Sequence, residues 1–270
     1  MLDQSARLRE LPTTALLLDA DGNLFPSEEP AFVASAVVTN AYLARLGLDV
    51  RFEAEELRLA TTGRNFRTTA VDLAVAHHVP VAAALAERHP DAVTAAPVLT
   101  PDLLEEWVLE EKRQVTRYLG DVLRPDPSVR EPLRRFAQHY VLAAVSSSAT
   151  GRLASCFVAT GLAELLPEER RFSAEDSLPV PTSKPDPAVY LFACAQLGIT
   201  PEQAVAVEDS VPGAQSAVAA GIPTIGNLQF VQQPERAERE EQLRAAGVDA
   251  VVTSWTEVER LLAPAARMSA

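Results

Sequence analysis

The sequence predicts an α/β fold, a doubly wound parallel sheet with an inserted α-helical domain. Short apolar runs alternate with helical patterns along residues 126–270, and the run Ala15–Leu18 has the same strand character. The residues between these two parts are mostly helical in pattern. Strands that alternate with helices are typical of a parallel sheet covered on both faces. We therefore expect a discontinuous α/β core domain, residues 13–25 and 126–270, and a helical domain of residues 26–125.

The first strand, Ala15–Leu18, contains only apolar residues, as is typical of a strand buried on both faces. Apolar residues three and four apart then predict several helices in the insert. Gly47 and Gly120 stand where helices would end, because glycine readily adopts the left-handed conformation of a helix C-cap. The segment 89–101 carries three prolines and is expected to be a loop.

After Pro125 the pattern changes to alternating helices and strands. A polar loop with a Pro-Val-Pro sequence interrupts the alternation. The expected order is helix 129–139, strand 140–148, helix 150–161, helix 185–198, strand 204–209, helix 211–221, strand 222–227, helix 234–247 and strand 249–253.

Composition and charge exclude several classes of function. The 270 residues are 47% hydrophobic and 23% charged, ordinary values for a globular chain, and the net charge is −13. Nucleic acids and anionic membranes bind basic faces, so neither is an expected partner. No apolar run is long enough for a signal peptide or a membrane span, and Cys156 and Cys194 lie far apart. We expect a cytoplasmic protein, a monomer or a small homo-oligomer, that acts on a small molecule.

Polar side chains follow the predicted strands at the points where they end. Parallel α/β sheets bind ligands at the carboxyl ends of their strands. If these side chains converge, they form an anion site around a divalent cation, and hard oxygen ligands without histidine or cysteine favour Mg²⁺. The residues are Asp19 and Asp21 after the first strand, Ser146–Ser148 after the second, Lys184 before a helix, and Glu208 and Asp209 after a later strand.

These residues resemble the four ordered motifs of the haloacid dehalogenase superfamily, subfamily I. The motifs are Asp19-Ala-Asp21-Gly-Asn-Leu, Ser146 after a strand, Lys184-Pro-Asp-Pro and Glu208-Asp209-Ser. Each is weak alone, since Asp-x-Asp-Gly also occurs in calcium loops, but four in the correct order are specific. The resemblance covers the whole core, implies a Rossmann-like sheet, and places the insert where this superfamily has its C1 helical cap.

The resemblance also implies roles for these residues. Asp19 would be the nucleophile that becomes an aspartyl phosphate, and Asp21 the general acid and base. The metal ligands would be Asp19, the backbone carbonyl of Asp21, Asp209, and Glu208 as a ligand or a neighbour of one. Ser146 and Lys184, with Ser147 as a further candidate, would bind the phosphoryl group. The implied enzyme is a Mg²⁺-dependent phosphatase of a small phosphomonoester metabolite, such as a sugar phosphate.

Other chemistries share these motifs. A haloacid dehalogenase lacks the second aspartate and the acidic pair. A phosphonatase needs a lysine early in the cap, and the only lysine of the cap here, Lys112, lies late in it. The serious alternative is a hexose phosphomutase of the β-phosphoglucomutase type, which usually has a cap histidine where this chain has Ala31. A non-catalytic binding protein would usually have lost a motif residue, and here every position is filled.

Two features depart from or extend the motif pattern. Asn23 stands where related sequences of this subgroup usually have threonine or valine, and Pro26-Ser27-Glu28 replaces a common Asp-Ser-Glu. In the cap, Arg64 and Arg67 of the sequence TTGRNFR are candidates for substrate contact, and each could equally be a solvated charge on a helix.

Overall fold

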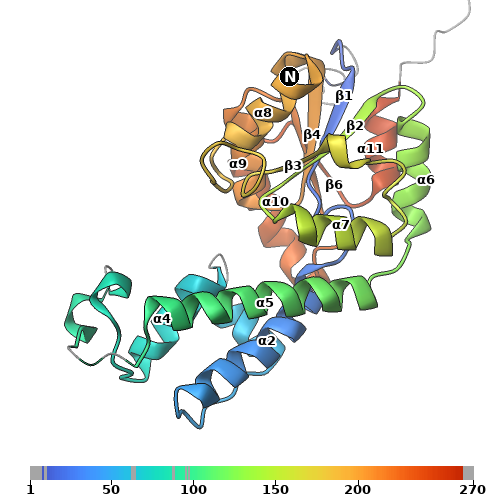
Figure 1. The fold of residues 1–270 in the computed structure, drawn as a ribbon. Helices are drawn as coiled ribbons and strands as arrows, with labels where there is room; N and C mark the ends of the chain where they lie inside the picture. Colours follow the sequence, from blue (N-terminus) through green and yellow to red (C-terminus); the bar gives the residue numbers. More distant parts are fainter. Residues whose placement is uncertain are drawn as a thin grey trace, which may run out of the picture. The chain divides into compact units, whose positions relative to one another are not determined.

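The computed structural model divides into two compact units, which we call the core unit and the helical unit (Figure 1). The core unit comprises Met1–Pro26 and Leu123–Ala270, and the helical unit comprises Ser27–Val122. The structure describes residues 8, 11–61, 65–86, 89–94, 96 and 98–263.

A six-stranded sheet, in which every strand runs parallel to its neighbours, forms the centre of the core unit. The strand order β3-β2-β1-β4-β5-β6 reverses direction at β1, so the sheet is doubly wound, and the predicted fold class is confirmed. The strands are β1 (Ala15–Leu18), β2 (Val141–Ser146), β3 (Arg171–Ser173), β4 (Ala204–Glu208), β5 (Thr224–Asn227) and β6 (Ala250–Val252).

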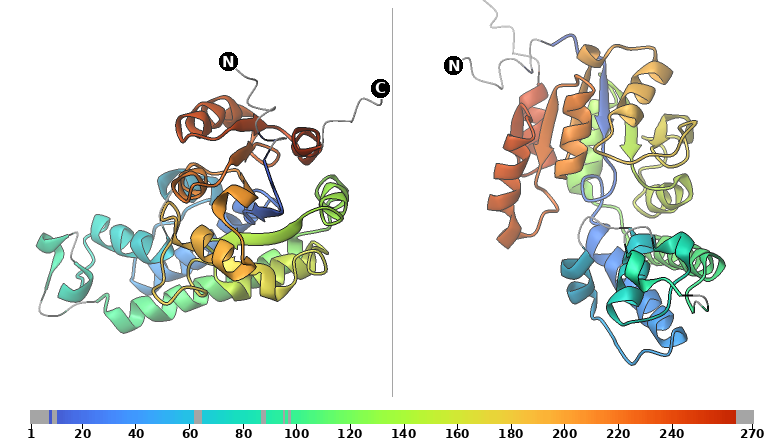
Figure 2. Two further views of the ribbon diagram at one scale, coloured as in Figure 1. Left: turned by 90° about the horizontal axis from the view of Figure 1, so that it is seen from above. Right: turned by 90° about the vertical axis from the view of Figure 1, so that its left-hand side faces the viewer.

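Helices cover both faces of this sheet (Figures 1 and 2). Side chains alternate between the two faces of a strand, so Leu17, Ala143 and Ala206 lie together on one face. They pack against Val189 and Ala217 in a buried apolar cluster. The helices of the core unit are α6 (Pro127–Phe136), α7 (Thr150–Ala159), α8 (Ala188–Leu197), α9 (Val211–Ala219), α10 (Arg236–Ala245) and α11 (Trp255–Leu262).

The central position of β1 determines where the functional side chains meet. β1 pairs with β2 on one side and with β4 on the other, in registers that set Leu18 beside Ala144 and Val207. The carboxyl ends of the three strands therefore lie next to one another at the topological switch point, where sheets of this kind bind ligands.

The helical unit is held together by its own apolar core. Tyr42 and Leu43 of one helix pack with Leu104 and Val108 of another, and the Tyr42 hydroxyl donates a hydrogen bond to the Ala70 carbonyl. Within the described residues, no helix of the protein has the length and apolar character to cross a membrane. The α-helices of this unit are α2 (Glu28–Arg45), α3 (Ala54–Thr61), α4 (Phe66–Ala76) and α5 (Pro101–Val122), and its 3-10 helices are η1 (Ala83–Leu85) and η2 (Pro90–Ala92).

The structure differs from the sequence-based expectation at three elements. Gly47 has a left-handed φ of 81° just after α2, as expected, but Gly120 lies inside α5, where the prediction of a helix end is wrong. A glycine costs a helix only about 1 kcal/mol, and burial of Val115 and Leu119 on the same helix offsets that cost. β3 lies in the segment expected to be a polar loop, and α11 had no counterpart among the expected elements.

Candidate active site

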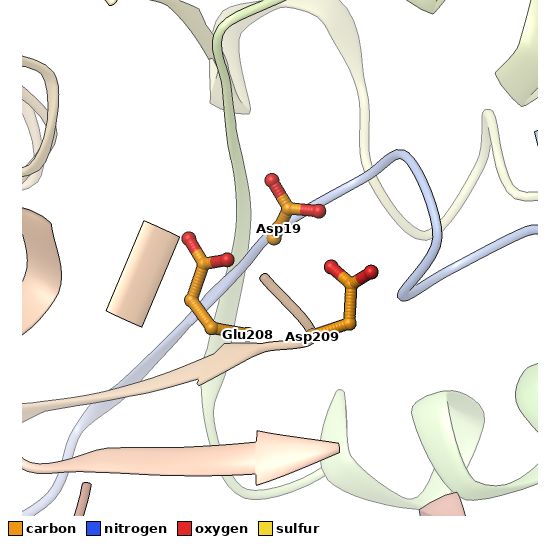
Figure 3. Close-up of side chains that lie close together, drawn as sticks. All are labelled: Asp19, Glu208 and Asp209. Atoms are coloured by element: carbon orange, nitrogen blue, oxygen red, sulfur yellow. The ribbon is translucent and has the colours of Figure 1, made fainter. Parts of the chain in front are cut away.

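Three carboxylates meet where β1 and β4 end (Figure 3). Asp19 directly follows β1, Glu208 is the last residue of β4, and Asp209 follows it. One oxygen from each lies within 4.8 Å of the others, and all three residues are buried. Burial raises the pKa of both Asp19 and Asp209, because the charged forms lose contact with water.

Lys184 supplies the positive charge that holds this cluster together. Its ammonium lies 2.5 Å from Asp19 Oδ1 and 2.6 Å from Glu208 Oε1, and it also donates to the Val145 carbonyl at 2.8 Å. Burial opposes the charge of Lys184, but the two carboxylates outweigh it and hold the pKa of Lys184 above its ordinary value. The lysine is therefore a fixed cation beside the first aspartate.

Two glycines make room for the acidic pair. Gly22 has a φ of 79°, a conformation that suits glycine, and a methyl group there would overlap the Asp209 carboxylate. Gly213, in the first turn of α9, lies so close to Glu208 that a methyl group would overlap that carboxylate. The sequence thus combines acidic residues at strand ends with glycines that admit their side chains.

The unpaired oxygens of this cluster fit a divalent cation. Glu208 Oε2 and Asp209 Oδ1 are buried and have no hydrogen-bond partner among the described residues. A buried carboxylate oxygen without a partner is costly, and three carboxylates exceed the single charge of Lys184. A hard cation such as Mg²⁺ takes oxygen ligands of this type and would supply the missing charge.

The second aspartate has surroundings of its own. Asp21 accepts a hydrogen bond from the Ser148 hydroxyl at 2.7 Å and pairs with the Arg152 guanidinium at 2.8 Å. Its side chain keeps about a quarter of its surface exposed (24%), against 9% for the side chain of Asp19. The two aspartates therefore lie two residues apart in environments that differ in burial and in cation partner.

Three serines lie at the end of β2 and directly after it, Ser146–Ser148. The Ser146 hydroxyl accepts a hydrogen bond from the Ser148 backbone N–H, and the Ser147 hydroxyl accepts one from the Lys184 backbone N–H. Ser147 thereby links the loop after β2 to the segment that carries the lysine. The structure brings Ser147, Lys184, Asp19, Glu208 and Asp209 into one connected group of contacts.

Comparison with known proteins places this arrangement in a family. The family model of haloacid dehalogenase-like hydrolases matches residues 13–221, which is most of the chain. The chain belongs to this hydrolase family. A solved structure of a HAD family hydrolase from Deinococcus radiodurans R1, with bound phosphate and sodium, is 32% identical, with a TM-score of 0.62 over 95% of this chain and 100% of the other.

Two further relatives extend the comparison. A phosphorylated carbohydrates phosphatase of Thermotoga maritima is 29% identical over 131 residues, which are 46% of this chain and 56% of that protein. This chain therefore matches little more than half the length of that curated relative. A structure described as a predicted phosphoglycolate phosphatase from Haemophilus somnus 129pt has a TM-score of 0.67 at 20% identity, over 93% and 99% of the two chains, and this likeness shows the fold.

Three contacts of this haloacid dehalogenase-like site involve residues that the sequence analysis missed. Arg152 is a basic residue in the first turn of α7, where the helix dipole disfavours a cation, and this mismatch is a signal in the sequence. The Tyr190 hydroxyl donates to Glu208 Oε1 at 2.5 Å, and the only hint was a phenol in an apolar helix. Arg239 donates to the Asp209 carbonyl at 3.1 Å from α10, whose sequence resembles a solvated face.

The helical unit contains the two arginines that the sequence suggested for substrate contact, Arg64 and Arg67. Arg67 forms an ion pair with Glu105 of the same unit, and both side chains are about half exposed. Arg64 lies outside the described residues. Both remain candidates from the sequence alone.

Proposed function

We propose that this member of the family is a Mg²⁺-dependent phosphatase that transfers the phosphoryl group of a small phosphomonoester to Asp19 and then to water. The observation that carries the proposal is the contrast between the two aspartates. Asp19 is buried beside Lys184 and the acidic pair, whereas Asp21 is more exposed and has separate partners. Asp19 can therefore attack phosphorus beside the buried lysine, while Asp21, outside the acidic cluster, exchanges a proton with the leaving oxygen and with water.

In the first step, a carboxylate oxygen of Asp19 forms a bond to phosphorus while the bond between phosphorus and the ester oxygen breaks. Asp21 donates its proton to that leaving oxygen, which departs as an alcohol. Lys184 and Ser146 bind the oxygens of the phosphoryl group as negative charge develops there. Mg²⁺ bound by Asp19, Glu208, Asp209 and the Asp21 carbonyl would reduce the repulsion between nucleophile and substrate.

In the second step, Asp21 accepts a proton from water, whose oxygen attacks the phosphorus of the aspartyl phosphate. The bond between phosphorus and the Asp19 oxygen breaks, which restores the carboxylate and releases inorganic phosphate. The helical unit, inserted between Pro26 and Leu123, is proposed to be the cap that excludes bulk water during the transfer. Arg64 and Arg67 are its candidates for contact with the substrate.

For the substrate we propose a phosphorylated carbohydrate or a similarly small metabolite. The Thermotoga maritima relative, a phosphorylated carbohydrates phosphatase, supports this class. A cytoplasmic location is part of the proposal, because both cysteines are buried and free in the structure.

The test is release of inorganic phosphate from a panel of hexose, pentose and triose phosphates, phosphoglycolate and nucleotides, in MgCl2 or in EDTA. We expect release in MgCl2 only, and none from Asp19→Asn. Conversion of β-glucose 1-phosphate to glucose 6-phosphate without phosphate release would identify a phosphomutase instead. Absence of both reactions, in a protein that binds Mg²⁺ but turns nothing over, would favour a binding role.

A further inference from the structure

A fully buried asparagine lies directly behind the proposed nucleophile. Asn23 is four residues after Asp19, and its side-chain Nδ2 donates two hydrogen bonds, to the Asp19 carbonyl and to the Val207 carbonyl, each 3.0 Å long. The Val207 carbonyl also accepts the Asp19 backbone N–H at 3.0 Å. Asn23 thus links the backbone of Asp19 to β4. This link lies one residue past Leu18, which forms the last pair of β1 with β4.

Asn23 belongs to a closed ring of hydrogen bonds, which we call the amide ring. Asn227 Nδ2 donates to Asn23 Oδ1 at 2.9 Å, and the Gln229 backbone N–H donates to Asn227 Oδ1 at 3.2 Å. The Trp255 backbone N–H donates to Gln229 Oε1 at 3.0 Å. The Trp255 indole N–H closes the ring on the Asn23 carbonyl at 3.0 Å. Its members are therefore Asn23, Asn227, Gln229 and Trp255.

The ring leaves Asn23 a single orientation. Both N–H groups and the side-chain oxygen of Asn23 have partners, and Asn23, Asn227 and Trp255 are all fully buried. Loss of one partner would leave a buried polar atom unsatisfied. Threonine at this position would offer one donor, and valine would offer none. The two bonds from Asn23 to the ends of β1 and β4 therefore need an amide side chain.

We propose that Asn227 and Trp255 are positioning residues for the nucleophile, acting through Asn23. They hold Asn23, which holds the Asp19 backbone against the end of β4, the strand that also carries Glu208 and leads to Asp209. The ring thereby fixes the position of Asp19 relative to the acidic pair. Its effect on turnover rests on the proposed function, whereas its effect on the Asp19 backbone does not.

The test compares Asn227→Ala with Thr224→Val, a control that removes a buried hydroxyl bond from the same strand, β5. The first measurement is amide hydrogen exchange. We expect Asn227→Ala to accelerate exchange at the Asp19 amide at least tenfold relative to the amides of β1. Thr224→Val should leave that ratio unchanged. Equal ratios in the two variants would overturn the proposal, because a general loss of stability would accelerate all these amides together.

The second measurement is phosphate release. Asn227→Ala should lower kcat about tenfold and change KM less than twofold, and Thr224→Val should retain the wild-type kcat. In the Asn23→Thr background, Asn227→Ala should have no further effect, because Asn227 acts through Asn23. Multiplicative effects of the two substitutions would refute that route.

The test can still be decided if Asn227→Ala does not fold or if the wild-type protein is inactive. If Asn227→Ala does not fold, Trp255→Phe removes the indole donor at the other side of the ring. The same two measurements then apply: the exchange rate of the Asp19 amide relative to the amides of β1, and the changes in kcat and KM. If the wild-type protein releases no phosphate, the proposed function fails, and the exchange ratio at Asp19 alone decides whether the amide ring positions its backbone.

Discussion

Lys184→Met would remove the only cation in direct contact with the buried carboxylates among the described residues. Lys184 bonds Asp19 and Glu208, its side chain is 5% exposed, and methionine has nearly the same length. Breaking a buried ion pair from one side costs about 3–5 kcal/mol, because it leaves an uncompensated charge. Since packing changes little, we expect a loss of about that size in the free energy of unfolding without metal.

The assay is thermal unfolding at neutral pH, first in EDTA and then in MgCl2. A loss of about 3–5 kcal/mol corresponds to a fall in Tm of about 6–20 °C for a chain of this size. Mg²⁺ should raise the Tm of Lys184→Met more than that of the wild type, because the variant site carries more negative charge for the cation to neutralise. Phosphate release should nevertheless stay at least a hundredfold below wild type, since Lys184 is the residue proposed to bind the phosphoryl group.

The matched control is Lys112→Met, which replaces the other lysine of the chain, an exposed residue of α5. It should change stability by less than about 0.5 kcal/mol. Equal Tm values for the two variants in EDTA would refute the view that Lys184 holds the cluster together. No rise in the Tm of either protein in MgCl2 would refute the cation site, and an equal rise in both would refute the charge coupling between the cation and Lys184.

Substitutions at three other positions test separate parts of the site. Asp19→Asn should abolish single-turnover phosphate release while the Tm stays within a few degrees; substantial residual turnover would contradict the nucleophile assignment. Gly213→Ala should lower the urea midpoint, because overlap with the Glu208 carboxylate exceeds the gain of about 1 kcal/mol that alanine gives a helix; a higher midpoint would contradict this. Arg152→Ala should lower kcat about tenfold and Arg152→Lys less, by loosening Asp21; a rise in KM alone would indicate substrate contact instead.

Local patterns in the sequence were sufficient to predict the fold class. β1 and β4 are short apolar runs bounded by turn residues, and each begins and ends within a residue of its expected position. β3 was missed because it is three residues long and begins with an arginine, so it shows neither an apolar run nor alternation. Gly120 misled because a glycine signals a helix end only where the chain also turns, and α5 continues through Gly120 to Val122.

The site was predictable to the extent that residues lie at strand ends. Asp19 and Glu208 follow paired strands, so the parallel topology alone brings them together. Arg152 and Trp255 reach the site through the direction of their side chains, which depends on helix packing and has no period in the sequence. Asn23 was recognised as a departure from a common motif, but its partner Asn227 lies 204 residues away, a separation that no local pattern connects.

The central position of β1 delays formation of the sheet while the chain is being synthesised. β1 is synthesised before the other strands of the sheet, yet its partner β2 begins beyond residue 140 and its partner β4 beyond residue 203. The helical unit is one continuous stretch of chain, Ser27–Val122, so all of it is synthesised before the strands that pair with β1. We therefore expect nascent chains shorter than about 210 residues to expose Ala15–Leu18 to chaperones. A truncated message that stops in α7 should accumulate bound to them rather than as a free folded domain.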